Sequence, residues 1–138
     1  MERDHIVRWA GDLKFTGTSA NGHSIVIDGD RQNGVSPMQL MLLGAGGCAC
    51  IDLVTILKKA RQNIIDVWVE IGGDRREELP RYFTNVEMHF VVTGVDVREQ
   101  YVKRAIALAM SKYCSASAQL AALAEIETSY KIIEAETR

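Results

Sequence analysis

Two of the three cysteines, Cys48 and Cys114, occupy positions from which their thiols could do chemistry together. Cys48 follows an uncharged, glycine-containing run, and Cys114 closes a helical-looking stretch. Two thiols that meet can reduce a peroxide, because one is oxidised to a sulfenic acid and the other captures it as a disulfide. The alternative is that both are buried structural residues, since cysteine is a common small hydrophobe of protein cores.

A thiol that attacks a peroxide must first ionise, and this usually requires a nearby cation or a helix N-terminus. The sequence around Cys48 offers neither. Asp52 comes four residues later and shares its helical face, so its carboxylate would disfavour the thiolate unless a basic side chain neutralises it. We therefore expect an unassisted Cys48 to react slowly.

The third cysteine and the histidines predict neither a metal site nor a cofactor. Cys50 lies two residues from Cys48, so on a helix the two thiols point to nearly opposite sides, and core packing is the better interpretation of Cys50. His5, His23 and His89 are isolated, without the spacing that zinc sites show. No phosphate-binding loop or dinucleotide motif occurs, so we expect no cofactor.

Length and charge place the chain among single-domain globular proteins. Its 138 residues suffice for one domain, residues 1–138, with a core of its own. Sixteen basic and eighteen acidic residues give a net charge of -2 without a basic block, so nucleic acid is not expected as a partner. Three cysteines and no visible secretory leader predict a reducing cytoplasm. The uncharged window 35–51 is shorter than the ~20 residues of a membrane span, so no membrane partner is expected.

The elements that must position the thiols begin with short strands. Alternating polar and apolar residues predict strands at 5–9, 13–16 and 24–28. Asn21-Gly22 predicts an antiparallel hairpin between the last two, because both residues tolerate positive φ.

A long helix carries Cys48. Ser36 is a suitable N-cap, Pro37 suits the first turn, and apolar residues continue to about residue 60. The segment 38–51 has no polar face, which a chain of this size cannot cover alone, so we expect a homodimer that buries this helix. Its glycines indicate either close backbone approach or a break between two helices.

The second half repeats both periodicities. Two strands are expected at 65–71 and 86–92, joined by the charged segment 74–81, with inward-facing residues at alternate positions. A helix over 97–114 places Cys114 at the edge of an apolar stripe, where it faces the core or an interface. A short helix near 117–124 and a strand at 126–133 complete an α+β fold with sheets covering helices. The members of the stripe are Val102, Ala105, Ile106, Ala109, Met110 and Tyr113.

Four motifs together resemble the OsmC/Ohr family of organic hydroperoxide reductases, and within it the YhfA-like branch. The motifs are Ser36-Pro37-Met38-Gln39, Ala45-Gly46-Gly47-Cys48, the run RREELPR at 75–81, and Lys112-Tyr113-Cys114-Ser115.

The resemblance covers essentially the whole chain. It implies antiparallel sheets wrapped around a long buried central helix, an intertwined homodimer with its active site at the subunit interface, and a role in oxidative stress. It also implies that Cys48 is the peroxide-reacting cysteine and Cys114 the resolving one.

Two positions depart from the family pattern. The family's glutamate, ten residues before the reactive cysteine, is replaced by Met38, with Gln39 next to it. The family's arginine from the early strands has no counterpart in the stretch 13–17. Arg8, Arg31 or an arginine of the 75–81 segment from the partner subunit would have to substitute, and the sequence does not select one.

These observations leave two functional hypotheses. The first is thiol-dependent reduction of organic or fatty-acid hydroperoxides by Cys48 and Cys114, reset by a dithiol that the resemblance suggests is of the lipoyl type; apolar Met38, Met41 and Leu42 would favour hydrophobic substrates. The second is a non-catalytic dimer of the same fold that binds a small apolar or anionic ligand at its interface. The arginine-rich 75–81 segment is either a solvated hairpin tip or an anion-recognition element.

Overall fold

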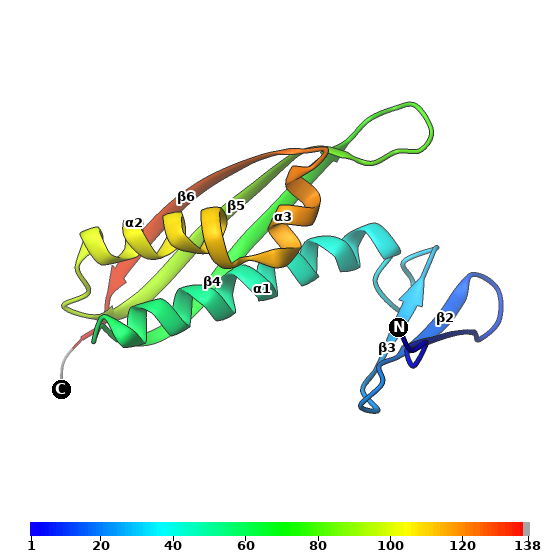
Figure 1. Ribbon diagram of the computed structural model, residues 1–138, viewed down its shortest axis with the longest axis horizontal. Coiled ribbons are helices and arrows are strands. Elements are labelled where there is room, and N and C mark those ends of the chain that lie inside the picture. The colour runs from blue at the N-terminus through cyan, green and yellow to red at the C-terminus, as the bar shows by residue number, and fades with distance from the viewer. Residues whose placement is uncertain (137–138) are drawn as a thin grey trace. The chain divides into compact units, whose positions relative to one another are not determined.

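The computed structural model describes residues 1–136, and the chain divides into two compact units, 1–41 and 42–138. The first unit contains three strands, and the second contains a mixed sheet and the helices that pack on it. Figure 1 shows these elements, most of them labelled. The fold is α+β, as the sequence predicts.

Three short strands form the sheet of the first unit. β1 (Ile6–Trp9), β2 (Lys14–Thr18) and β3 (Ser24–Asp28) pair antiparallel in that order. Gly22 in the β2–β3 connection has φ 89°, a left-handed conformation that glycine adopts without strain. The predicted hairpin around Asn21-Gly22 is confirmed, although its connection spans 19–23 rather than two residues.

The segment after β3 folds around one buried carboxylate. Asp28 is 1% exposed, and its oxygens accept hydrogen bonds from the backbone N–H groups of Asp30 (2.9 Å), Gln32 (3.3 Å) and Asn33 (3.0 Å). These bonds, that from Asn33 foremost, lower the pKa of Asp28 below its ordinary value. Where the sheet ends, the Asp28 carboxylate thus accepts the backbone hydrogen bonds that a neighbouring strand would otherwise accept.

α1 (Pro37–Lys59) is one continuous helix. Its first turn is closed by a capping box, since the Gln39 backbone N–H donates to Ser36 Oγ (3.1 Å) and the Ser36 N–H donates to Gln39 Oε1 (2.9 Å). Ser36 was predicted as the N-cap but Gln39 was not predicted as its partner, although the Ser-x-x-Gln spacing is the signal of a capping box.

One face of α1 packs on the sheet of the second unit. Ala45, Ala49, Leu53 and Leu57 are fully buried along it. A Cβ on Gly46 would lie 3.0 Å from Val69 Cγ1, so close approach is the correct alternative for this glycine and a helix break is wrong.

The other face of α1 is open within one chain, so this central helix is not buried all round. Leu43 and Ile51 are 53% and 69% exposed. By length and composition alone α1 would suffice to cross a membrane, with 28% of its apolar window buried. The four buried side chains on its sheet-facing stripe are those of a core helix.

The sheet of the second unit has the order β4-β5-β6, and one of its two pairings corrects the expectation of antiparallel sheets. β4 (Asn63–Arg75) and β5 (Phe83–Val95) are antiparallel, whereas β6 (Glu125–Glu134) runs parallel to β5. A parallel neighbour requires a crossover connection, which the helices between β5 and β6 provide. Helical periodicity between two strands is compatible with either direction, so the sequence pattern did not distinguish them.

Alternation along these strands is interrupted at Val91, which is 2% exposed between two buried residues, and at Ile65. Val86, Met88, Phe90 and Val92 of β5 are at most 1% exposed, as predicted. A bulge between Ile64 and Asp66 shifts the register of β4 and leaves Ile65 62% exposed instead of inward.

The crossover contains α2 (Glu99–Leu108), a π-helical turn η1 (Ala109–Tyr113) and α3 (Ser115–Ala121). Val102, Ala105 and Ile106 of the predicted stripe are buried, but Tyr113 is 47% exposed. Tyr113 is the last residue of the wider π turn, whose spacing differs from that of an α-helix, and this explains why the stripe fails at its end. Figure 1 shows α1 and α2 on the same side of the sheet.

The 75–81 segment is a hairpin tip held by its own arginines. Arg76 donates to the carbonyls of Pro80 (2.7 Å) and Leu79 (3.0 Å), and its guanidinium lies 4.3 Å from the Tyr82 ring centroid. Arg75 and Arg81 also donate to backbone carbonyls of the same loop. These bonds favour the structural interpretation of the arginine cluster.

Candidate active site

Cys48 and Cys114 meet inside the second unit. Cys48 lies on α1, and Cys114 lies at the junction between η1 and α3. The two sulfur atoms and a carboxylate oxygen of Asp52 all lie within 4.8 Å of one another. Both cysteines are free thiols in the structure.

The π turn and the cap of α3 together position Cys114. Its N–H donates to the Ala109 carbonyl at 2.7 Å, closing the wide turn. The Cys114 sulfur then accepts the Ser117 N–H (3.4 Å) as the N-cap of α3 and lies 2.9 Å from Ser117 Oγ. The side chain is 3% exposed, so the expectation that Cys114 faces the core or an interface is confirmed.

Burial dominates the ionisation of this thiol. It raises the pKa of Cys114, because the charged thiolate loses hydration. The two hydrogen bonds from Ser117 oppose this effect, and the neighbouring Cys48 adds to it. Burial also raises the pKa of Cys50, which is not a member of the Cys48–Asp52–Cys114 cluster.

Asp52 is the third member of the cluster. It lies one turn after Cys48 on α1, and its Oδ2 is buried without a hydrogen-bond partner among the described residues. A buried carboxylate oxygen without a partner carries a desolvation cost that a bound proton, donor or cation would offset. The sequence predicts that Asp52 shares the helical face of Cys48, but it indicates only electrostatic repulsion of a Cys48 thiolate.

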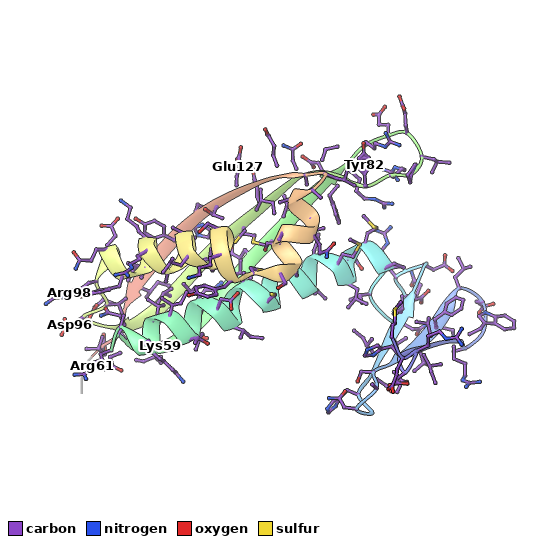
Figure 2. The ribbon with its side chains drawn as sticks, in the orientation of Figure 1. Lys59, Arg61, Tyr82, Asp96, Arg98 and Glu127 are labelled. Atoms are coloured by element: carbon purple, nitrogen blue, oxygen red, sulfur yellow. The ribbon has the colours of Figure 1, made fainter. Side chains whose placement is uncertain are left out.

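A pocket of about 250 Å³ opens beside the cluster. Its wall is mainly apolar and includes one cation, Lys59, which Figure 2 shows at the end of α1. The lining residues are Asp52, Thr55, Ile56, Lys59, Leu108 and Tyr113. An apolar molecule with a polar end could therefore lie next to Asp52.

The other predicted site residues are found elsewhere. Arg8 lies on β1 and Arg31 in the 28–35 loop, both in the first unit. The side chain of Gln39 is engaged in the capping box. Ser117, which the sequence did not indicate as a site residue, contacts the Cys114 sulfur directly; its three-residue spacing from Cys114 is the only signal that could have indicated it.

Comparison with known proteins identifies the family of this chain. The family described as OsmC-like protein matches residues 28–129, and Protein YhfA of Escherichia coli K12 is 44% identical over 130 residues, covering 94% of this chain and 97% of its own. The chain belongs to the OsmC-like family. The family match spans parts of both compact units.

Solved structures share the OsmC-like fold over nearly the whole chain. A hypothetical protein from Aquifex aeolicus is 28% identical with a TM-score of 0.88, covering 99% of this chain and 100% of its own. An organic hydroperoxide resistance protein OsmC from Legionella pneumophila is 16% identical with a TM-score of 0.69, covering 92% and 96%. The second likeness concerns the fold alone.

Proposed function

We propose that this OsmC-like protein reduces organic hydroperoxides, including those of fatty acids, through Cys48 and Cys114. The observation that carries the proposal is the approach of the two sulfurs to within 4.8 Å from separate helical segments. Membership of a family that includes hydroperoxide resistance proteins supports the substrate class.

The reaction needs two thiols and one peroxide bond. The Cys48 thiolate attacks the terminal peroxide oxygen, the O–O bond breaks, and the alkoxide leaves as an alcohol with the proton that Cys48 gave up. The Cys114 thiolate then attacks the sulfur of the Cys48 sulfenic acid, and hydroxide leaves as water with the Cys114 proton. A cellular dithiol, of the lipoyl type in this proposal, reduces the disulfide and is itself oxidised.

The pocket beside Asp52 suits the proposed substrates. Ile56 and Leu108 supply apolar wall, and Lys59 lies where a carboxylate at the end of a fatty-acid chain would be favoured. The exposed Leu43 and Ile51 on α1 support a homodimer in which each chain is a single OsmC-like domain. We place this dimer in the cytoplasm, where thiols remain reduced.

Thiol counting with and without peroxide tests the proposal. Reduced protein is mixed with one equivalent of cumene hydroperoxide, and free thiols and intact mass are followed. We expect rapid loss of two of the three thiols and a Cys48–Cys114 disulfide by peptide mapping. Cys114→Ser should instead accumulate a sulfenic acid at Cys48, trapped by dimedone.

Cys50→Ser is the matched control, because Cys50 lies outside the cluster. It should lose two thiols at the wild-type rate. Unchanged thiols in the wild type, or a disulfide that includes Cys50, would contradict the proposal.

The pocket also supports a second function, binding of a small apolar or anionic ligand without catalysis. It is favoured by Met38, which stands at the position where the family carries its glutamate, with Gln39 next to it. In that case Cys48→Ser would retain ligand binding, measured with a fluorescent fatty acid, whereas Lys59→Ala would weaken binding of anionic ligands selectively.

A further inference from the structure

The Cys48–Asp52–Cys114 cluster has a donor set that no single part of the sequence predicts. Cys48 and Asp52 are one helical turn apart on α1, and Cys114 approaches from the η1–α3 junction. Each contributes one potential ligand atom, and these atoms lie within 4.8 Å of one another. Three donors from two elements can surround a single ion.

Asp52 supplies a second, independent observation. Its Oδ2 is buried and has no hydrogen-bond partner among the described residues, whereas the Cys114 sulfur of the same cluster is hydrogen-bonded to Ser117. Leaving a carboxylate oxygen buried and unpaired is unfavourable, and a cation among the three donors would remove that cost.

The chemistry of the donors selects the ion. Two thiolates and one carboxylate suit Zn²⁺, whereas Mg²⁺ and Ca²⁺ require oxygen ligands throughout. Zn–S distances of about 2.3 Å and Zn–O distances of about 2.0 to 2.2 Å imply tetrahedral edges of roughly 3.5 to 3.8 Å. The three potential ligand atoms already lie within 4.8 Å of one another, so only a short approach would bring them to these edges.

The surroundings of Cys114 resemble the outer shell of a metal ligand. Ser117 contacts its sulfur through both the N–H (3.4 Å) and the hydroxyl (2.9 Å). Hydrogen bonds of this kind orient a ligating thiolate and stabilise its charge. The neighbouring pocket leaves room for a fourth, exchangeable ligand.

We infer that Cys48, Asp52 and Cys114 form a Zn²⁺ site with one open coordination position. The site does not depend on the proposed peroxidase function, because it needs only the reduced thiols. The two states exclude each other: a disulfide removes both sulfur ligands, and bound Zn²⁺ withholds both thiolates from peroxide. The ion therefore protects the pair from oxidation and inhibits its turnover.

Cobalt substitution tests the site directly. Reduced, metal-free protein is titrated with Co²⁺, which reports thiolate ligation through near-ultraviolet charge transfer and tetrahedral geometry through intense visible bands. We expect one Co²⁺ per chain, displaced stoichiometrically by Zn²⁺. The same protein oxidised to the Cys48–Cys114 disulfide, or with both thiols alkylated, should give no such spectrum.

Variants assign the ligands. Asp52→Asn should weaken Zn²⁺ binding by about tenfold or more in a chromophoric chelator competition, and Cys48→Ser and Cys114→Ser should abolish the charge-transfer band. Cys50→Ser and Asp66→Asn, an exposed carboxylate of β4, are matched controls and should bind as the wild type does. Circular dichroism establishes that each variant is folded.

Three outcomes would overturn the site: no charge-transfer band in the wild type, equal weakening by Cys50→Ser, or unaltered affinity in folded Asp52→Asn. The peroxide assay, carried out in the presence of a chelator, separates the two proposals. If Co²⁺ binds but peroxide produces no disulfide, the metal site is supported and the peroxidase proposal is refuted. If peroxide produces the disulfide but Co²⁺ does not bind, the peroxidase proposal is supported and the metal site is refuted.

Discussion

At the scale of single residues, the two thiols are in unequal environments. Cys114 is almost fully buried and its pKa is raised by that burial, while Ser117 is the group that opposes the shift. Cys48 on α1 is only half-buried. This asymmetry suits an attacking thiol at Cys48 and a resolving thiol at Cys114.

Ser117→Ala should slow the resolving step. The change removes one of the two hydrogen bonds that lower the pKa of Cys114, so less thiolate is present at neutral pH. We expect disulfide formation after a peroxide pulse to slow by roughly three- to tenfold, while sulfenic acid formation at Cys48 keeps its rate. Rapid-quench mass spectrometry in metal-free buffer separates the two steps. Equal slowing of both steps would show that Ser117 acts on the structure as a whole.

At the scale of elements, a glycine on α1 allows the helix to pack closely on its sheet. Gly46 lies where a Cβ would come within 3.0 Å of Val69 Cγ1 on β4. Glycine has a low helix propensity, and at this position it allows α1 to pack closely on β4.

Gly46→Ala should destabilise the protein in spite of alanine's better helix propensity. The propensity gain is at most about 1 kcal/mol, whereas overpacking typically costs 1 to 3 kcal/mol, so we expect a net loss of about 1 kcal/mol in urea unfolding. In the Val69→Ala background the same change should cost less, because the clashing methyl is gone. Additive effects in this cycle would rule out the contact as the cause.

The 28–35 loop of the first unit depends on an ionised carboxylate. Backbone N–H groups lower the pKa of Asp28 in the folded chain, so its stabilising effect is complete above the unfolded value and is lost as the pH falls through the folded value. We expect the amide protons of this loop to lose hydrogen-exchange protection on acidification below about pH 4. Asp28→Asn should show lower protection at neutral pH and little acid dependence. Asp30→Asn, at an exposed position, is the control, and its loop protection should depend on pH as in the wild type.

At the scale of the whole molecule, a single chain leaves apolar surface uncovered. Leu43 and Ile51 on α1 and Ile65 on β4 are each more than half exposed, although they are large aliphatic side chains. A second copy of the chain is the partner that the OsmC-like family membership favours, and we expect the functional form to be this homodimer.

Ile51→Asp should convert the dimer to a monomer. Ile51 is 69% exposed in one chain, and a carboxylate there would be buried without a partner in a dimer that covers this face of α1. Light scattering after size exclusion should give the mass of two chains for the wild type and one for the variant. Leu79→Asp, at the 85% exposed hairpin tip, should remain dimeric. A monomeric wild type would refute the homodimer.

Local pattern was sufficient for much of this protein. Alternation predicted β5, three- and four-residue spacing predicted α1 and the buried part of α2, and Asn21-Gly22 predicted the hairpin, because burial imposes a period that each element shows along its own residues. The motifs around Cys48 and Cys114 were sufficient for the family.

Only the tertiary structure decided the features that join distant parts of the chain. Register and crossover geometry decide the parallel direction of β6, the exposure of Ile65 and the π turn before Cys114. The periodicity of hydrophobic residues carries no information about either. The same holds for Asp52: from sequence it is a carboxylate beside one thiol, and in the fold it is the third donor of a cluster completed from another element. Periodicity reports which side of an element is buried, whereas packing between elements decides which atoms meet there.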